Sequence, residues 1–283
     1  MIRPPFDPRV TPARPDLAAA HLRGQIEAAR FVEGQTFQAH LGGVPIRRAP
    51  DAAAMQEDQL LFGEVFTVYE QKDGWGWGQS AHDDYVGYVE MAALSAPPIV
   101  VTHRICALRT YAFSAPDLKS PPLLLLSLNA KARLEREEAG YAKLARTGWV
   151  PLRHLAPLAQ TDADWVGVAE QFLGSPYLWG GRESLGLDCS GLLQTALEAA
   201  GIVAPRDADM LEKLGRPLPL GVEDLQRGDM VFWKGHCGVM LDGRRLLHAN
   251  AFHMQTAIEP LAQAAQRIAQ TAGPIRAIKR LDI

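Results

Sequence analysis

The chain has 283 residues, of which 47% are hydrophobic and 22% charged, and its net charge is −3 at pH 7. This composition excludes a disordered or fibrous chain, and the length suffices for two or three domains. Because a near-neutral chain has no basic field, we expect neither nucleic-acid binding nor binding to an anionic membrane.

The cysteine count and the first residues both indicate the reducing environment of the cytoplasm. Cys106, Cys189 and Cys237 are the only cysteines, too few for a disulfide framework in a chain of this length, which favours a reducing environment. Five prolines interrupt the first 20 residues, so the apolar run of a secretory signal is missing there. We therefore expect a soluble protein of the cytoplasm.

The first predicted element is a helix over residues 16–31, where apolar residues recur at helical spacing after Asp16 as N-cap. It belongs to a predicted N-terminal helical segment, residues 1–40. Short strands follow, separated by turn signals such as Asp73-Gly74, and they predict a small β-barrel over residues 41–96. The strands are predicted at residues 60–62, 65–69, 75–78 and 85–89.

A second β module is predicted over residues 97–158. The Ser-Ala-Pro-Pro linker at residues 95–98 separates it from the first. Both modules end with a similar pattern: an aromatic residue, then a valine, then a leucine a few positions later. This similarity indicates two divergent copies of one module. Its strands are predicted at residues 100–102, 123–126 and 147–152.

Residues 159–283 have a different pattern, with helices before strands. Helices are predicted at 165–173 and 190–200, and strands at 230–233, 239–241 and 246–249. This order is typical of an α+β domain.

The segment 175–201 contains the first candidate for chemistry. Asp188 lies at the N-cap of the second helix and Cys189 in its first turn. Unpaired N–H groups and the helix dipole favour an anion there, which lowers the pKa of a thiol. The charge of Asp188 opposes a thiolate, so a neighbouring histidine would have to outweigh it. A purely structural cysteine is the alternative, but the surrounding glycines indicate an open turn.

Two histidines are candidate partners for Cys189. His236 begins one predicted strand and His248 lies in the next, with the turn signal Asp242-Gly243 between them. Their separation is even (248 − 236 = 12), so they share a face only if the connection has an odd number of residues or a bulge. We predict such a connection, with His236 as base and His248 orienting its ring.

Other arrangements stay open at this point. His253 could orient His236 in place of His248. A zinc site of Cys189, His236, Cys237 and His248 is a further alternative, although their spacing matches no common zinc motif. We expect no metal and no cofactor.

Five short segments contain the candidate residues and their neighbours: PYLWGG (176–181), DCSG (188–191), GDMVFW (228–233), HCGVM (236–240) and LHAN (247–250). In order and spacing they resemble the NlpC/P60 cysteine peptidases. The resemblance covers roughly residues 160–283 and implies a papain-like catalytic domain, while the upstream modules resemble bacterial SH3 domains. The whole resembles the γ-D-glutamyl-L-diamino acid endopeptidases, which cleave peptidoglycan stem peptides between D-glutamate and the diamino acid.

The resemblance implies roles for four catalytic residues. Cys189 corresponds to the nucleophile, His236 to the base and His248 to the third polar residue. Tyr177 corresponds to the tyrosine that supports the oxyanion hole, which the backbone N–H of Cys189 could complete.

It also implies substrate contacts. Glu64 and Tyr85 correspond to the residues of the first SH3 domain that recognise a free L-alanine amine, and Asp188 and Ser190 to contacts beside the nucleophile. Cys237 departs from the family pattern, which has an aliphatic residue there. Strand alternation turns it away from His236, so we expect a packing role, and oxidation with Cys189 only if it reaches that sulfur.

The predicted fold is therefore an α+β, papain-like catalytic domain preceded by two small SH3-like β-barrels. The predicted function is a cytoplasmic cysteine endopeptidase for muropeptides of the type L-Ala-γ-D-Glu-diamino acid, acting in cell-wall recycling. A Cys/His amidase or acyltransferase with another substrate, and a non-catalytic cell-wall-binding protein, are the alternatives. The oligomeric state and the diamino acid stay open.

Overall fold

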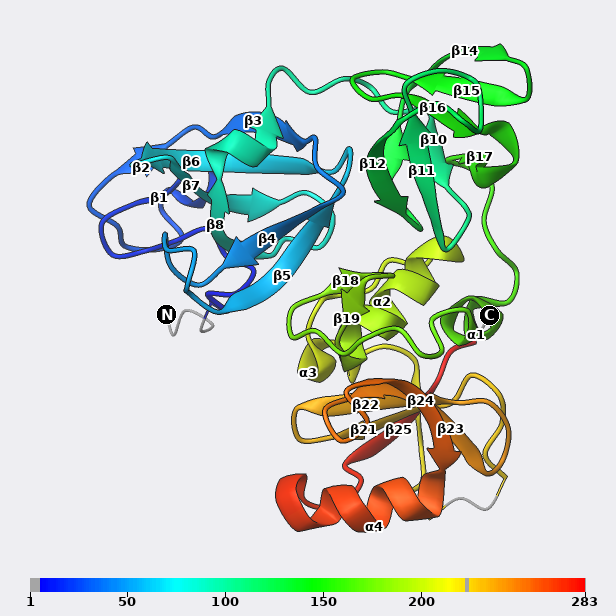
Figure 1. The fold of residues 1–283 in the computed structure, drawn as a ribbon. Helices are drawn as coiled ribbons and strands as arrows, with labels where there is room; N and C mark the ends of the chain where they lie inside the picture. Colours follow the sequence, from blue (N-terminus) through cyan, green and yellow to red (C-terminus); the bar gives the residue numbers. More distant parts are fainter. Residues whose placement is uncertain (1–5, 222–223, 283) are drawn as a thin grey trace. The chain divides into compact units, whose positions relative to one another are not determined.

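The computed structural model describes residues 6–221 and 224–282. The chain divides into two compact units, with the division between Leu158 and Ala159 (Figure 1). This is the point at which the sequence predicts the start of the catalytic domain. Within the described ranges, no helix has the length and apolar character needed to cross a membrane.

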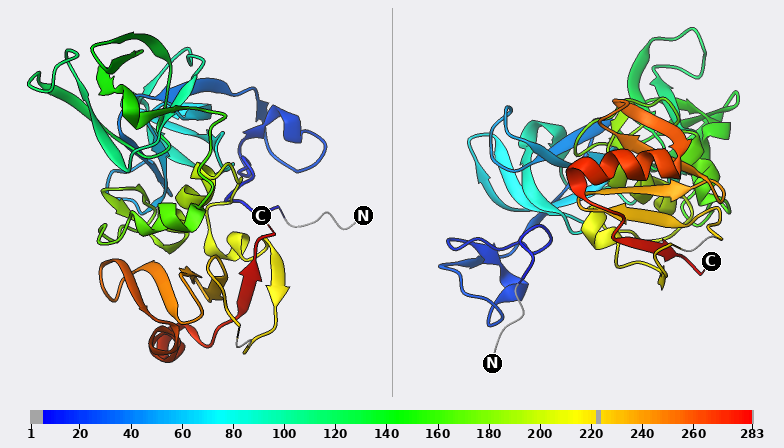
Figure 2. Two further views of the ribbon diagram at one scale, coloured as in Figure 1. Left: turned by 90° about the vertical axis from the view of Figure 1, so that its right-hand side faces the viewer. Right: turned by 90° about the horizontal axis from the view of Figure 1, so that it is seen from below.

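The predicted helix over residues 16–31 is wrong. The segment forms no α-helix but a short 3-10 turn and two-residue strands, and Figure 2 shows it in dark blue. Prolines precede it, and Gly24 turns the backbone at a φ of 78°. Arg30, within the segment, pairs with Glu70 of the following sheet, and the guanidinium of Arg14, just before it, lies 4.4 Å from the centroid of the Trp77 ring. Contacts with that sheet therefore override the helical spacing. Its elements are β1 (Ala18–Ala19), η1 (Ala20–Leu22) and β2 (Phe31–Val32).

A seven-stranded antiparallel sheet follows, which we call the first barrel. All four strands predicted here form, and Asp73 and Gly74 have φ values of 50° and 82°, as a tight hairpin turn requires. The sheet order is β5-β4-β8-β7-β6-β3-β9. The strands are β3 (Gln35–Ala39), β4 (Gly43–Arg47), β5 (Gln56–Leu61), β6 (Val65–Lys72), β7 (Trp75–Ser80), β8 (Val86–Glu90) and β9 (Leu94–Ser95), with the turn η2 (Met91–Ala93) before the last.

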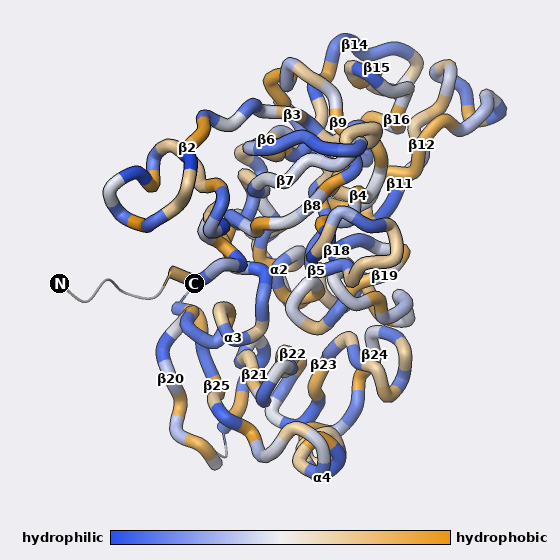
Figure 3. The backbone as a smooth tube through the Cα atoms, turned by 90° about the vertical axis from the view of Figure 1, so that its left-hand side faces the viewer, coloured by the Kyte–Doolittle hydropathy of each residue, from blue (hydrophilic) through white to orange (hydrophobic). Residues whose placement is uncertain are grey.

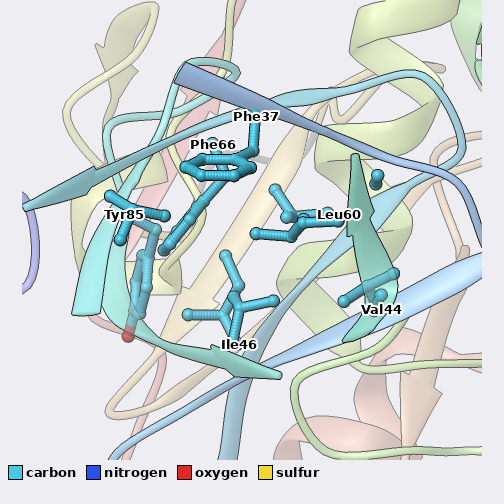
Figure 4. Close-up of a cluster of buried hydrophobic side chains, with 11 residues drawn as sticks. Phe37, Val44, Ile46, Leu60, Phe66 and Tyr85 are labelled. Carbon is cyan, nitrogen blue, oxygen red and sulfur yellow. The ribbon is translucent and has the colours of Figure 1, made fainter. Parts of the chain in front are cut away.

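The predicted start of the first barrel at residue 41 is also wrong. Strand β3 already belongs to the sheet, because Phe37 pairs with Phe66 of β6 and both side chains are buried in its core. The labelled members of this core are Phe37, Val44, Ile46, Leu60, Phe66 and Tyr85 (Figure 4).

The second β body has two small sheets, of order β13-β10-β17 and β12-β11-β16-β15-β14. The strand predicted at residues 100–102 is wrong: Val100 is exposed and gains no burial from pairing, and β10 begins at His103. That this body is a second SH3-like barrel stays a prediction. Its elements are β10 (His103–Ile105), β11 (Arg109–Phe113), β12 (Pro122–Ser127), β13 (Lys131–Ala132), β14 (Leu134–Glu138), β15 (Tyr141–Leu144), β16 (Trp149–Pro151), η3 (Leu152–His154) and β17 (Leu155–Pro157).

The core of this second body is not separate from the first barrel. Leu61 and Phe62, at the end of β5, are buried in one cluster with Ile105 and Leu126. The backbone N–H of Lys131 donates to the carbonyl of Phe62 at 2.8 Å. The two β bodies therefore share buried surface.

The second unit has an antiparallel six-stranded sheet of order β20-β25-β21-β22-β23-β24. Figure 1 shows helix α2 on one side of the sheet and α4 on the other, and Figure 3 shows hydrophobic and hydrophilic residues interspersed along its strands. Helices α1 and α2 precede strands β21 to β23 as predicted, although α1 is shorter than the predicted helix and α4, which follows β24, was not predicted. The elements are α1 (Trp165–Glu170), β18 (Arg182–Glu183), β19 (Gly186–Leu187), α2 (Cys189–Ala199), α3 (Ala208–Leu211), β20 (Arg216–Leu218), β21 (Met230–Trp233), β22 (His236–Met240), β23 (Arg245–Asn250), β24 (Gln255–Pro260), α4 (Leu261–Ala272) and β25 (Ala277–Arg280).

Candidate active site

Cys189 is the first residue of α2, as predicted, and its side chain is buried. The N-cap is Asp188, whose Oδ1 accepts a hydrogen bond from the backbone N–H of Gly191 at 2.7 Å. The thiol therefore lies where the free N–H groups of the helix favour a negative charge.

The charge of Asp188 has a partner that was not predicted. The buried guanidinium of Arg206 donates to both carboxylate oxygens of Asp188, at 3.0 and 2.7 Å, and to Oγ of Ser190 at 2.9 Å. This ion pair offsets the repulsion that Asp188 would exert on a thiolate. A single arginine outside any motif carries no signal that would have revealed it.

Asp188 and Ser190 are both buried, and the second oxygen of Asp188 also accepts from the N–H of Gly180 at 2.8 Å. Their contacts hold the turn before α2 together. Their predicted role as substrate contacts stays a prediction.

The pKa of the Cys189 thiol is held well below its ordinary value. The largest cause is a hydrogen bond from Cys237; burial opposes it, and the positive charge of His236 and a hydrogen bond from its ring add to the lowering. The pKa of Cys237 is raised by its own burial and by the adjacent Cys189 sulfur, so Cys237 is the thiol that keeps its proton. The expectation that Cys237 only packs was incomplete: alternation turns it to the face opposite His236, and its thiol and that of Cys189 shift each other's pKa.

His236 and His248 lie on one face of the sheet, as predicted. Nε2 of His236 is 2.8 Å from Nδ1 of His248. The last pair of the β22–β23 hairpin is Met240 with Leu246, so five residues, 241–245, lie between these paired positions; Arg245 already counts as part of β23 because it pairs with Pro260 of β24. The prediction of an odd connection is confirmed, and it is the reason that two histidines at an even separation meet.

Neither alternative arrangement of the histidines is seen. Nδ1 of His253 bonds to Oδ1 of Asn250 at 3.0 Å, while His248 holds the position beside His236. Among the described residues, the ligand atoms of Cys189, His236, Cys237 and His248 do not form a group close enough together to share one metal ion. Those of His248, His253 and Glu259 do. In that second group, Glu259 already accepts hydrogen bonds from Arg267 and from His248.

The other ring nitrogen of His248, Nε2, is 2.7 Å from Oε1 of Glu259. His248 is fully buried, and its pKa is lowered to about 4 by burial and by the neighbouring charge of His236. Glu259 had not been predicted. It lies in β24, where Leu246 pairs with Glu259 and His248 with Ala257, so His248 and Glu259 are diagonal neighbours on one face.

Tyr177 is half-buried, and its backbone N–H donates to the carbonyl of Met254 at 3.0 Å. The pKa of its hydroxyl is raised by burial and then by the negative charges of Cys189 and Asp188. The hydroxyl therefore stays protonated and can donate a hydrogen bond, as an oxyanion-hole residue must. That role stays a prediction.

Glu64 and Tyr85 belong to the other unit. Glu64 is buried in the turn after β5; its Oε2 accepts from the N–H of Leu61 at 2.8 Å, and His82 Nδ1 and Lys131 Nζ each lie 3.7 Å from Oε1. The ring of Tyr85 packs at the margin of the barrel core, and its hydroxyl points away from the cluster (Figure 4). Their predicted part in recognising an amine stays a prediction.

Two family models match the chain. The model described as "Bacterial dipeptidyl-peptidase Sh3 domain" matches residues 46–94, in the first barrel. The model described as "NlpC/P60 family" matches residues 174–270, which include all the catalytic candidates named above.

Curated and solved relatives agree with these matches. Gamma-D-glutamyl-L-lysine dipeptidyl-peptidase of Bacillus subtilis (strain 168) is 30% identical over 220 residues, 68% of this chain and 72% of that protein. Dipeptidyl-peptidase 6 of Lysinibacillus sphaericus is 36% identical over 86 residues, 30% of this chain and 31% of that protein. The structure of an NlpC/P60 family protein from Bacillus cereus ATCC 10987 superposes with a TM-score of 0.74 at 19% identity, covering 87% of this chain and 99% of that one; this likeness concerns the fold.

Proposed function

The chain belongs to the NlpC/P60 family, and on that premise we propose that it is a cysteine peptidase that hydrolyses the γ-D-glutamyl-diamino acid bond of peptidoglycan stem peptides. The observation that carries the proposal is the arrangement of Cys189, His236 and His248. A buried thiol of lowered pKa lies at a helix N-terminus beside a histidine whose far nitrogen is 2.8 Å from a second, buried histidine.

This arrangement suits acyl transfer through a covalent intermediate. The Cys189 thiolate attacks the γ-carbonyl carbon, and the oxyanion that forms accepts hydrogen bonds from the Tyr177 hydroxyl and the backbone N–H of Cys189. His236 then gives its proton to the leaving amine as the C–N bond breaks. Water attacks the thioester, His236 takes its proton, and the acid product leaves with the thiolate restored.

We propose that the substrate is L-Ala-γ-D-Glu-diamino acid with a free L-alanine amine. The names of two relatives, a gamma-D-glutamyl-L-lysine dipeptidyl-peptidase and a dipeptidyl-peptidase, support it, because release of a dipeptide requires a recognised N-terminus. Glu64 is a buried carboxylate, the type of group that favours an ammonium over a neutral amide. Muropeptides of this size would be met in the cytoplasm during cell-wall recycling, which is the role we propose.

The test is cleavage of L-Ala-γ-D-Glu-diaminopimelate by the wild-type protein and the Cys189→Ala variant. We expect the wild type to release L-Ala-D-Glu and the variant to be inactive. Absence of wild-type cleavage would overturn the proposal and leave the amidase, acyltransferase or cell-wall-binding alternatives.

The free-amine requirement has its own comparison. We expect N-acetylation of the tripeptide to abolish cleavage by the wild type, and Glu64→Gln to lose the preference for the free amine. Equal cleavage of the acetylated and free peptides would contradict this part of the proposal.

A further inference from the structure

We propose that Glu259 and Arg267 are a positioning pair that holds His248 neutral, with its proton on Nε2, so that His248 can accept a hydrogen bond from His236. The inference rests on the proposed function, because it assigns a role to two residues behind the catalytic histidines. Neither residue would touch the substrate or the reacting atoms.

The two hydrogen bonds of His248 assign its proton. Nε2 faces a carboxylate oxygen of Glu259 at 2.7 Å, and an ionised carboxylate only accepts hydrogen bonds. The proton of the neutral imidazole must therefore lie on Nε2, which leaves Nδ1 as an acceptor 2.8 Å from Nε2 of His236. His236 donates from Nε2, and its Nδ1 is left to face the Cys189 sulfur.

This assignment matters because the reactive form of the site contains an imidazolium. When His236 holds the proton taken from Cys189, both of its ring nitrogens are donors. His248 can satisfy one of them only while its Nδ1 carries no proton. A protonated His248 would place an N–H donor and a second positive charge against His236, and would favour return of the proton to the sulfur.

Arg267 explains why Glu259 does not itself charge His248. A lone buried carboxylate 2.7 Å from an imidazole raises the pKa of that imidazole. Here the guanidinium of Arg267, from α4, donates to both oxygens of Glu259, to Oε2 at 2.7 Å. The pair is neutral as a whole and Glu259 stays ionised. Burial and the charge of His236 lower the pKa of His248 to about 4, Glu259 opposes this, and the charge of Arg267 adds to the lowering.

This pair is among the titratable and charged groups that face His248. The facing groups are His236 from β22, Glu259 from β24, Arg267 from α4, and His253 from the turn after β23, whose ring centroid is 6.5 Å away. Arg267 is itself held, since its guanidinium lies 4.1 Å from the centroid of the Phe252 ring.

The first experiment measures thiolate formation without substrate, by following absorbance near 240 nm or the rate of alkylation of Cys189 against pH. In Arg267→Met, Glu259 loses its counter-charge, so we expect His248 to take up a proton at higher pH and the lower limit of the thiolate range to rise by about one pH unit or more. Arg227→Met, which removes an exposed pair with Asp164 and Glu170, is the matched control and should leave that limit unchanged.

The second experiment uses the tripeptide. We expect Glu259→Ala to lower kcat on the order of 100-fold with little change in KM. Glu259→Gln should restore much of kcat, because its amide oxygen still accepts from Nε2–H. Unfolding curves show whether each variant is folded. If Arg267→Met is unfolded, Arg267→Lys takes its place; because it keeps the positive charge, it should keep the wild-type thiolate profile.

The results distinguish failure of the positioning role from failure of the proposed function. An unchanged thiolate profile in a folded Arg267→Met, or wild-type kcat in Glu259→Ala, would overturn the positioning role. A wild-type protein that forms the thiolate but does not cleave the tripeptide would instead overturn the proposed substrate, while the thiolate titration would still test this inference.

Discussion

The buried thiols of Cys237 and Cys189 shift each other's pKa in opposite directions, and Cys237 is the largest single cause of the low pKa of Cys189. Neighbouring positions in β22 therefore supply two partners to one sulfur. His236 provides the charge and the proton acceptor, and Cys237, on the opposite face of the strand, provides a neutral donor.

Replacing Cys237 by alanine should raise the pKa of Cys189, since the thiolate would lose the neighbour that contributes most to its stabilisation. Cys237→Ser keeps a donor and should remain closer to the wild type. Alkylation rates against pH measure the change. Cys106→Ala, a half-buried cysteine elsewhere, is the control; a profile for Cys237→Ala that matches this control would show that the contact has no electrostatic effect.

The same contact predicts reversible oxidation. Hydrogen peroxide would convert the Cys189 thiolate to a sulfenic acid with loss of hydroxide, and the Cys237 thiol would condense with it to a disulfide with release of water. We expect peroxide inactivation of the wild type to be reversed by dithiothreitol, and that of Cys237→Ser to become irreversible at high peroxide. Peptide mapping by mass spectrometry should find the 189–237 disulfide, and its absence after inactivation would contradict this route.

Removing Arg206 should destabilise the protein strongly. Arg206→Met leaves the buried carboxylate of Asp188 without its counter-charge, which costs about 3–5 kcal/mol of unfolding free energy. Arg216→Met removes an exposed pair with Asp282 and should cost less than about 1 kcal/mol. Urea unfolding of both variants measures the difference, and similar losses would refute the assigned role of Arg206.

The free energy of unfolding should fall as the pH drops from about 6.5 to about 4. The folded-state pKa of His248 lies below its unfolded value, so the unfolded chain binds the proton first, and the stability present at neutral pH is lost across this window. The contribution is on the order of 3 kcal/mol. Urea unfolding at pH 7 and pH 4.5 should show a smaller pH dependence for His248→Asn than for the wild type; an equal dependence would mean that His248 does not titrate in this range.

Gly238 should be needed for the position of His248. A Cβ built on Gly238 would lie 2.9 Å from Cβ of His248 and 3.0 Å from the carbonyl oxygen of Leu247, so Gly238→Ala must displace His248. We expect kcat for the tripeptide to fall by on the order of 10-fold. Gly243→Ala in the hairpin connection, where the nearest contact is 3.2 Å, is the control and should stay near the wild-type rate.

The parts of the site that could be predicted from the sequence depend on local rules. Asp188 and Cys189 follow from helix capping, and the meeting of His236 with His248 follows from strand parity. Arg206 and Glu259 could not be found in this way. Each is a single charged residue whose partner is brought near only by packing, and the strand containing Glu259 was not predicted.

The fold shows the same division. The hairpin at Asp73-Gly74 has a strong local signal and forms as predicted. The helix over residues 16–31 does not form, because its spacing pattern contains no information on the pairing of Arg30 with Glu70 of β6. Predictions from local periodicity are correct where local interactions determine the conformation. They are wrong where contacts with residues distant in the sequence determine it.

The junction at Gly63 bears on how the first unit could have been assembled. A Cβ at this position would lie 1.7 Å from the carbonyl oxygen of Lys131, and Leu61 and Phe62 beside it are buried with side chains of the second β body. Two β bodies that pack this closely cannot be replaced or transferred to another protein as independent domains. A chain cut within the linker at residues 95–98 would expose the apolar side chains of both halves, so the two bodies should melt in a single transition.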